Sequence, residues 1–236
     1  PLGRMIGLLI GWRITFLMVG IISVLLLIFQ TIYLPKLQTT QAFTLNELPD
    51  LLKNKQLITI YGISLLFASA YYTAYSYIEP FLAQVANLSN NSITLVLSLF
   101  GVAGIGGSYL FSKFYNLNRK RFILISLFCL TIVLFVLKPS TASIITLLLI
   151  CVVWGMSSTA FNVACQSETI LVTNEQTSSI AMSIFSGIFN LGIGLGSFIG
   201  GQTINILNIQ SIGYIAGIIG ILSVIFYIRR RKSMLK

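Results

Sequence analysis

The sequence contains no histidine and only five acidic residues, against fifteen lysines and arginines. The absence of histidine excludes histidine metal sites, Ser/His catalytic triads and histidine proton relays, and with them most enzyme mechanisms. The three cysteines lie inside apolar runs without C-x-x-C spacing, so they indicate neither a disulfide framework nor a metal site. We therefore expect no metal, no cofactor and no enzymatic activity.

Charged residues are also scarce, at 8% of the chain, whereas hydrophobic residues make up 56% and the mean hydropathy is +0.92. This composition is typical of membrane proteins. The net charge of +10 must then be carried by loops, where the positive-inside bias explains it without a nucleic-acid partner. We expect a lipid bilayer around the chain and no bound nucleic acid.

Gaps between charged residues predict seven transmembrane helices, because a span needs about 20 largely apolar residues. Five of them cover residues 14–34, 56–82, 93–112, 122–137 and 141–166. The uncharged stretch 176–228 is long enough for two more, with a break at residues 205–211. Residues 168–176 form a polar connection, and the mixed stretch 36–55 reads as a loop with a short surface helix. The predicted fold is an all-α polytopic bundle.

Basic residues gather in alternate loops, which predicts the orientation of the chain. Only Arg13 and Lys138, with Arg4 unassigned, fall on one side of the membrane. The other side collects the basic tail at residues 229–236 together with Lys36, Lys53, Lys55, Lys113, Arg119, Lys120 and Arg121. Because cytoplasmic loops retain lysine and arginine, we expect the C-terminus in the cytoplasm.

A glycine pattern occurs twice, first at Gly3, Gly7 and Gly11 and again at Gly192, Gly196 and Gly200. Glycines four residues apart form a smooth helical stripe on which another helix can pack closely, although such patterns are common in any helical bundle. The two copies are predicted to run in the same direction, six helices apart. A parallel six-helix repeat is the arrangement of the two halves of major facilitator transporters. The chain begins without methionine, so its start looks like a cut, and we expect it to hold the end of helix 5 followed by helices 6 to 12.

Three longer motifs resemble one branch of that superfamily. They read YTAYSYIEPF at residues 72–81, LFGVAGIGGS at 99–108 and AMSIFSGIFNLGIG at 181–194, and the start, PLGR with GWR at 11–13, agrees with them. They are similar to the bacterial sugar efflux transporters of the drug:proton antiporter branch. The resemblance implies residues 1–34 as the end of helix 5 and helix 6 of an N-terminal bundle, 35–55 as the central cytoplasmic loop, 56–228 as the C-terminal six-helix bundle and 229–236 as the tail. It also implies a bacterial cytoplasmic membrane and a missing N-terminal bundle as partner.

The loop from Gly107 to Arg121 departs from the superfamily pattern. Many facilitators carry a Gly-x-x-x-Asp-Arg-x-Gly-Arg-type sequence here, which holds the cytoplasmic gate. This chain instead has Asn116, Arg119, Lys120 and Arg121, which supply cations but no acid. We therefore do not expect a charge-relay gate in this candidate gate loop.

Few acids fall within a predicted span, where an ionisable side chain usually has a function. Glu79 follows Tyr71 and Tyr75 at four-residue steps, so all three would share one stripe of a continuous helix. Glu79 is then the candidate for proton coupling. It lies about 35 Å beyond Gln56 along an ideal helix, so a solvated position near the outer interface is the alternative. Glu168 and Glu175 are expected at cytoplasmic helix ends, either solvated or forming a gate.

Substrate-lining candidates are the tyrosines and amides within the spans, because sugars need hydroxyl and amide partners with aromatic faces. The tyrosines could instead belong to an aromatic belt, and the amides could instead bond a neighbouring helix. The candidates are Tyr71, Tyr72, Tyr75, Asn162, Gln166 and Asn190.

We expect a secondary transporter that exports a sugar or related small molecule by alternating access, with proton antiport. The alternatives are a multidrug efflux antiporter and a truncated membrane fragment that does not transport.

Overall fold

The computed structural model describes residues 3, 6–7, 10–34, 51 and 53–230, and the chain divides into two units, residues 1–42 and 43–236. Arg4, the predicted loop at 35–50 with Lys36, and the tail at 231–236 lie outside the described residues. The two units are described separately.

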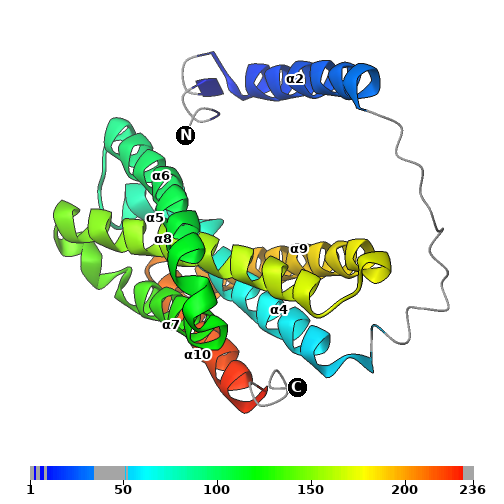
Figure 1. Cartoon of the computed structure of the whole chain (residues 1–236). Helices are drawn as coiled ribbons and strands as arrows, with labels where there is room; N and C mark the ends of the chain where they lie inside the picture. Colours follow the sequence, from blue (N-terminus) through cyan, green and yellow to red (C-terminus); the bar gives the residue numbers. More distant parts are fainter. Residues whose placement is uncertain (1–2, 4–5, 8–9, 35–50, 52, 231–236) are drawn as a thin grey trace. The chain divides into compact units, whose positions relative to one another are not determined.

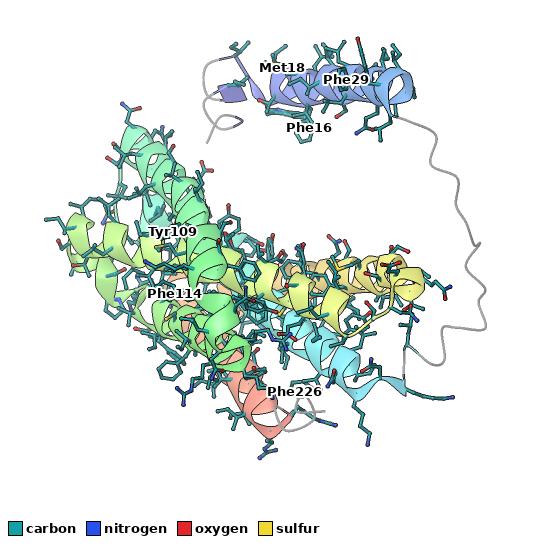
Figure 2. The ribbon with its side chains drawn as sticks, in the orientation of Figure 1. Phe16, Met18, Phe29, Tyr109, Phe114 and Phe226 are labelled. Carbon is teal, nitrogen blue, oxygen red and sulfur yellow. The ribbon has the colours of Figure 1, made fainter. Side chains whose placement is uncertain are left out.

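The first unit holds α2 (Trp12–Tyr33). Its large apolar side chains, including Phe16, Met18 and Phe29 (Figure 2), are exposed on all sides. A helix that is apolar all round is typical of a membrane span. Gly11 caps its N-terminus at a φ of 111°, a conformation that favours glycine. Gly11 therefore lies at a turn and does not extend a helical stripe from Gly3 and Gly7, which corrects the prediction for the first glycine pattern.

In the second unit, all the regular secondary structure of the described residues is helical (Figure 1). The all-α prediction is confirmed. Its helices are α4 (Lys55–Tyr75), α5 (Ile78–Gln84), α6 (Asn90–Phe114), α7 (Arg119–Val136), α8 (Ile144–Leu171), α9 (Glu175–Ile206) and α10 (Ile212–Arg230), with short 3₁₀ turns η2 (Tyr115–Leu117), η3 (Pro139–Ala142) and η4 (Ile209–Ser211).

Polar residues in the predicted turns start four of these helices. The side chains of Asn54, Ser89, Asn118 and Asn174 accept hydrogen bonds from backbone N–H groups in the first turns of α4, α6, α7 and α9. Those N–H groups have no partner within the helix, so a side-chain oxygen stabilises the start. The same residues that interrupt hydrophobicity therefore also fix the helix boundaries.

Six helical segments among the described residues are long and apolar enough to cross a membrane. They are α2, α4 with α5, α6 with η2, α8, α9, and α10 with η4. The seventh predicted span is α7, which has 18 residues and begins with the cations Arg119, Lys120 and Arg121. It is the shortest of the predicted spans, as the sequence indicated.

In the second unit α4 packs against α9 and α10, and α10 also packs against α7. The helix α8 packs against both α6 and α7. Figure 1 shows α4 running beside α9. The most deeply buried large side chains of α4 include Leu57, Ile60 and Phe67. This arrangement places α4 and α8 in the interior, where their polar side chains can face each other.

The second glycine pattern lies on the face of α9 that contacts α4. A methyl group on Gly192 would come within 2.6 Å of Ala68 Cβ, and one on Gly196 or Gly200 would collide with the carbonyl oxygens of Ser69 and Thr73. The glycines therefore allow the two backbones to approach closely, as small residues do in membrane helix pairs.

Two differences from the predicted spans bear on the candidate site. The helix expected over residues 56–82 is interrupted at Ser76 and Tyr77, between α4 and α5. The Tyr77 hydroxyl donates a 2.9 Å hydrogen bond to the carbonyl oxygen of Ser197 on α9, and the Ser76 and Ser197 hydroxyls lie 2.7 Å apart. Tertiary hydrogen bonds thus accompany the break, which apolar content alone does not reveal.

The other difference is in α8, which continues five residues beyond the predicted end at Gln166 and contains Glu168. Glu168 was assigned to a polar connection, but its side chain is buried. Partners from the preceding helices make this burial possible, as described below.

Candidate functional site

Aromatic side chains from three helices meet in the middle of the second unit. The rings of Tyr71 and Tyr75 on α4 lie 4.9 Å apart between centroids. Trp154 of α8 packs edge-on against both, at 5.8 and 6.2 Å, and Phe100 of α6 stacks on Tyr75 at 5.2 Å. Tyr72 completes the group, with its ring 4.8 Å from that of Tyr71. The three predicted tyrosines thus belong to one aromatic cluster.

A cavity of about 210 Å³ adjoins this cluster and opens between α4, α8 and α9. Two of the predicted tyrosines and one predicted amide line it, namely Tyr71, Tyr72 and Asn162. The remaining lining residues are Phe67, Ser158, Thr159 and Phe189. The lining combines aromatic faces with amide and hydroxyl groups, and none of the described residues that form it is Asp, Glu, Lys or Arg.

The two amides of α8 act on each other. The Gln166 side-chain amide donates a hydrogen bond to Oδ1 of Asn162, one turn away on the same helix. Of these two amides, Asn162 lines the cavity and Gln166 does not. Because its Oδ1 is occupied, the Asn162 NH₂ group is directed by Gln166 and can donate to an oxygen in the cavity. Gln166 is therefore positioned to orient Asn162.

Asn190 is not brought to this cavity. It is exposed on α9, and its Nδ2 donates a 2.8 Å hydrogen bond to the carbonyl oxygen of Ser186 in the same helix. The neighbouring Phe189 lines the cavity in its place.

Glu79 lies apart from the tyrosines with which it was grouped. It is exposed in the first turn of α5, beyond the break at Ser76 and Tyr77. Tyr71, Tyr75 and Glu79 therefore do not form one stripe of a continuous helix, which corrects that part of the prediction.

The candidate gate loop obtains an acid from another helix. Oε1 of Glu168 on α8 accepts a 2.8 Å hydrogen bond from the Tyr115 hydroxyl and lies 3.7 Å from Nη1 of Arg119. Of the two interpretations of Glu168, the solvated one is wrong, since only 8% of the residue is exposed. The loop itself supplies no acid, as the sequence indicates, and the carboxylate that faces Arg119 comes from α8.

The other residues of that loop have different surroundings. A methyl group on Gly107 would collide with the carbonyl oxygen of Met156, so α6 and α8 approach closely there. Lys120 accepts a 3.0 Å hydrogen bond at its carbonyl oxygen from Tyr227 of α10. Asn116 and Arg121 are exposed. The loop is thus tied to α8 and α10.

Trp154, Phe100, Phe67, Ser158, Thr159 and Phe189 were not found from the sequence. Five of these six are ordinary residues of an apolar span, without a signal that separates cavity lining from lipid contact. Trp154 is one of two tryptophans in the chain and lies near the middle of a predicted span rather than at an interface. That position was the available signal, because tryptophans of membrane helices usually lie at the interface.

Comparisons with known proteins agree with the architecture. A family model described as Major Facilitator Superfamily matches residues 1–169 and 116–236. The chain is 39% identical over 228 residues to a "probable sugar efflux transporter" of Mannheimia succiniciproducens, which is 97% of this chain and 57% of that protein. Proteins of the same name from Pasteurella multocida and Helicobacter acinonychis are 35% and 36% identical, over 97% and 96% of this chain. The chain spans a little over half the length of these relatives.

Proposed function

Because the chain belongs to the Major Facilitator Superfamily, we propose that it forms part of a secondary transporter that exports a sugar or related neutral small molecule. The observation that carries the proposal is the cavity of aromatic, amide and hydroxyl groups between α4, α8 and α9. The names of the relatives support the same substrate class. The family and the six apolar helices make the chain a multi-pass membrane protein.

The chemistry of the cavity favours a neutral polyol. A sugar ring offers C–H faces that pack on aromatic rings and hydroxyl groups that exchange hydrogen bonds with amides. Tyr71 and Tyr72 supply the aromatic faces, Asn162 supplies an oriented NH₂ donor, and Ser158 and Thr159 supply hydroxyls. A charged substrate would need a countercharge, which this lining does not contain.

Transport would proceed by alternating access between this six-helix unit and a second, N-terminal bundle. The cavity would then be one half of the substrate site, with the second bundle completing it. The basic residues at the end of α6 and the start of α7 favour a cytoplasmic position for the loop at residues 115–121, and the C-terminus would lie on the same side. The membrane would be the bacterial cytoplasmic membrane.

The buried Glu168 would hold the cytoplasmic side of the unit closed. It joins α8 to Tyr115, in the turn that follows α6, and to Arg119, the first residue of α7. Opening that side requires these contacts to separate or to move together as one rigid group. Protons are the proposed coupling ion, and Glu79 remains the proposed carrier because it is an acid beside the α4–α5 break.

Efflux kinetics of an Asn162→Ala variant test the proposal. Losing one hydrogen bond of about 0.5–1.5 kcal/mol to the substrate should raise the KM for efflux of a labelled glycoside about 2- to 12-fold. Asn208→Ala is the control, since it removes an exposed amide at the turn before η4. Equal KM values for the two variants would contradict the assignment. If Asn162→Ala instead altered resistance to apolar drugs and left glycoside efflux unchanged, the multidrug alternative would hold.

A further inference from the structure

A second cavity, also of about 210 Å³, lies between α6 and α7 where both helices pack along α8. Leu110 of α6 forms one wall, and Phe122, Ile125 and Cys129 of α7 form the other. Ile125 is 60% exposed, so the cavity is an open groove on the outer surface of the described bundle. It shares no residue with the cavity between α4, α8 and α9.

The floor of the groove comes from α8. Val153 and Met156 are its larger floor residues, while Ser157 and Ala160 are small and leave its depth unfilled. The lining residues cover about two turns of α7 and of α8, so the groove runs along these helices, which in a membrane is also the direction of a lipid acyl chain.

The groove has hydroxyl groups in its lining, yet it presents a largely apolar surface. The Ser157 hydroxyl donates a hydrogen bond to the carbonyl oxygen of Trp154 at 3.1 Å, and the Ser126 hydroxyl donates to that of Phe122 at 3.0 Å. Both donors are thus satisfied within their own helices. A hydrocarbon chain can then occupy the groove without leaving a buried polar group unpaired.

Two exposed cations lie at the adjoining ends of α6 and α7, within about one helical turn of groove-wall residues. Lys113 follows Leu110 by three residues on α6, and Arg121 precedes Ile125 by four residues on α7, so each shares a helix face with a groove wall. The Lys113 ammonium lies 5.9 and 5.4 Å from the rings of Tyr109 and Phe114, both labelled in Figure 2. Arg119, by contrast, is directed to Glu168.

We propose that this groove binds one acyl chain of an anionic phospholipid of the surrounding bilayer, with the lipid phosphate at Lys113 and Arg121. An apolar slot that ends at a pair of cations matches the order of groups along such a lipid. A basic residue near a membrane surface strengthens the binding of anionic lipid by roughly 5-fold, so two should give on the order of 25-fold. The proposal requires only that the helices cross a membrane and is independent of the transported substrate.

Native mass spectrometry of the purified protein tests the headgroup. Dioleoyl phosphatidylglycerol should be retained with more than 10-fold higher affinity than dioleoyl phosphatidylcholine, which has the same acyl chains. The double variant Lys113→Gln and Arg121→Gln should lose this preference. The control is Lys53→Gln with Lys55→Gln, which removes two exposed cations at the start of α4 and should keep it. Equal retention of both lipids, or equal effects of both double variants, would overturn the proposal.

Cysteine labelling tests the acyl chain. Cys151 and Cys165 are 1% and 0% exposed, whereas Cys129 is partly exposed in the groove, so a maleimide should modify Cys129 selectively. Phosphatidylglycerol should slow this modification, and glycerol phosphate, which has the headgroup charge without acyl chains, should not. Equal protection by phosphatidylglycerol and glycerol phosphate would identify a site for soluble phosphate and would refute the proposed acyl-chain site. An absence of protection by phosphatidylglycerol would also refute it.

Discussion

Replacement of Gly196 by alanine should separate α9 from α4. Gly196 faces α4 in the middle of α9, and an added methyl group would collide with the carbonyl oxygen of Ser69 and lie 3.0 Å from the backbone nitrogen of Thr73. Both obstacles are backbone atoms, which cannot rotate away as a flexible side chain can. The helices must therefore move apart along their whole contact, or the substitution must bend one of them.

The expected loss is about 1–3 kcal/mol in the free energy of unfolding, the usual cost of inserting a methylene-sized group into a packed interior. The same helix offers a matched control in Gly194, where an added methyl group meets nothing within 4 Å. Gly194→Ala should be neutral or stabilising by up to about 1 kcal/mol, because alanine favours the helix over glycine. The two variants change the composition identically, so their difference isolates the contact between α4 and α9.

Unfolding by sodium dodecyl sulfate in lipid bicelles would measure both values, followed through tryptophan fluorescence in a Trp12→Phe background so that only the buried Trp154 reports. We expect Gly196→Ala to unfold at lower detergent than the wild type and Gly194→Ala to unfold at the same or higher detergent. If the two variants unfolded at the same detergent concentration, the close contact between α9 and α4 at Gly196 would not contribute to stability. The assignment of the glycine pattern to helix packing would then be wrong.

Two further substitutions address the acids. Glu79→Gln should abolish the stimulation of efflux by an inward proton gradient and leave substrate counterflow intact, and unchanged gradient-driven efflux in proteoliposomes would remove Glu79 as the proton carrier. Tyr115→Phe should lower the free energy of unfolding by about 1.5–3 kcal/mol, because it removes the hydrogen bond that the Tyr115 hydroxyl donates to the charged carboxylate of the buried Glu168. Tyr109→Phe, at a position 61% exposed, should change it little. Similar losses in the two tyrosine variants would show that the hydroxyl of Tyr115 contributes nothing specific.

Most of the fold was predictable because spans and turns follow different local rules. Uncharged stretches of sufficient length located the helices, and the asparagine and serine residues between them proved to be N-caps of α4, α6, α7 and α9. These signals depend only on neighbours in sequence. They are therefore available without knowledge of which helices pack together.

The errors in the fold have a common cause in contacts between distant residues. Glu168 continues a helix because Tyr115 and Arg119, 53 and 49 positions earlier, supply a donor and a cation for its carboxylate. The break between α4 and α5 likewise occurs where Tyr77 and Ser76 bond Ser197 of α9. In both cases a polar side chain is accommodated by a partner that sequence spacing cannot identify.

The same limit decides which of the predicted site residues meet. Asn162 and Asn190 are equivalent in the sequence, since each is an amide within an apolar span. They differ because α4 brings Tyr71 and Tyr72 to the face of α8 that carries Asn162, whereas Asn190 bonds its own helix at Ser186. Periodicity can place a residue on a face of its helix, but the chemistry of a site depends on which other helix covers that face. The amide of Asn162 becomes a directed donor only through Gln166 behind it and the aromatic rings in front of it.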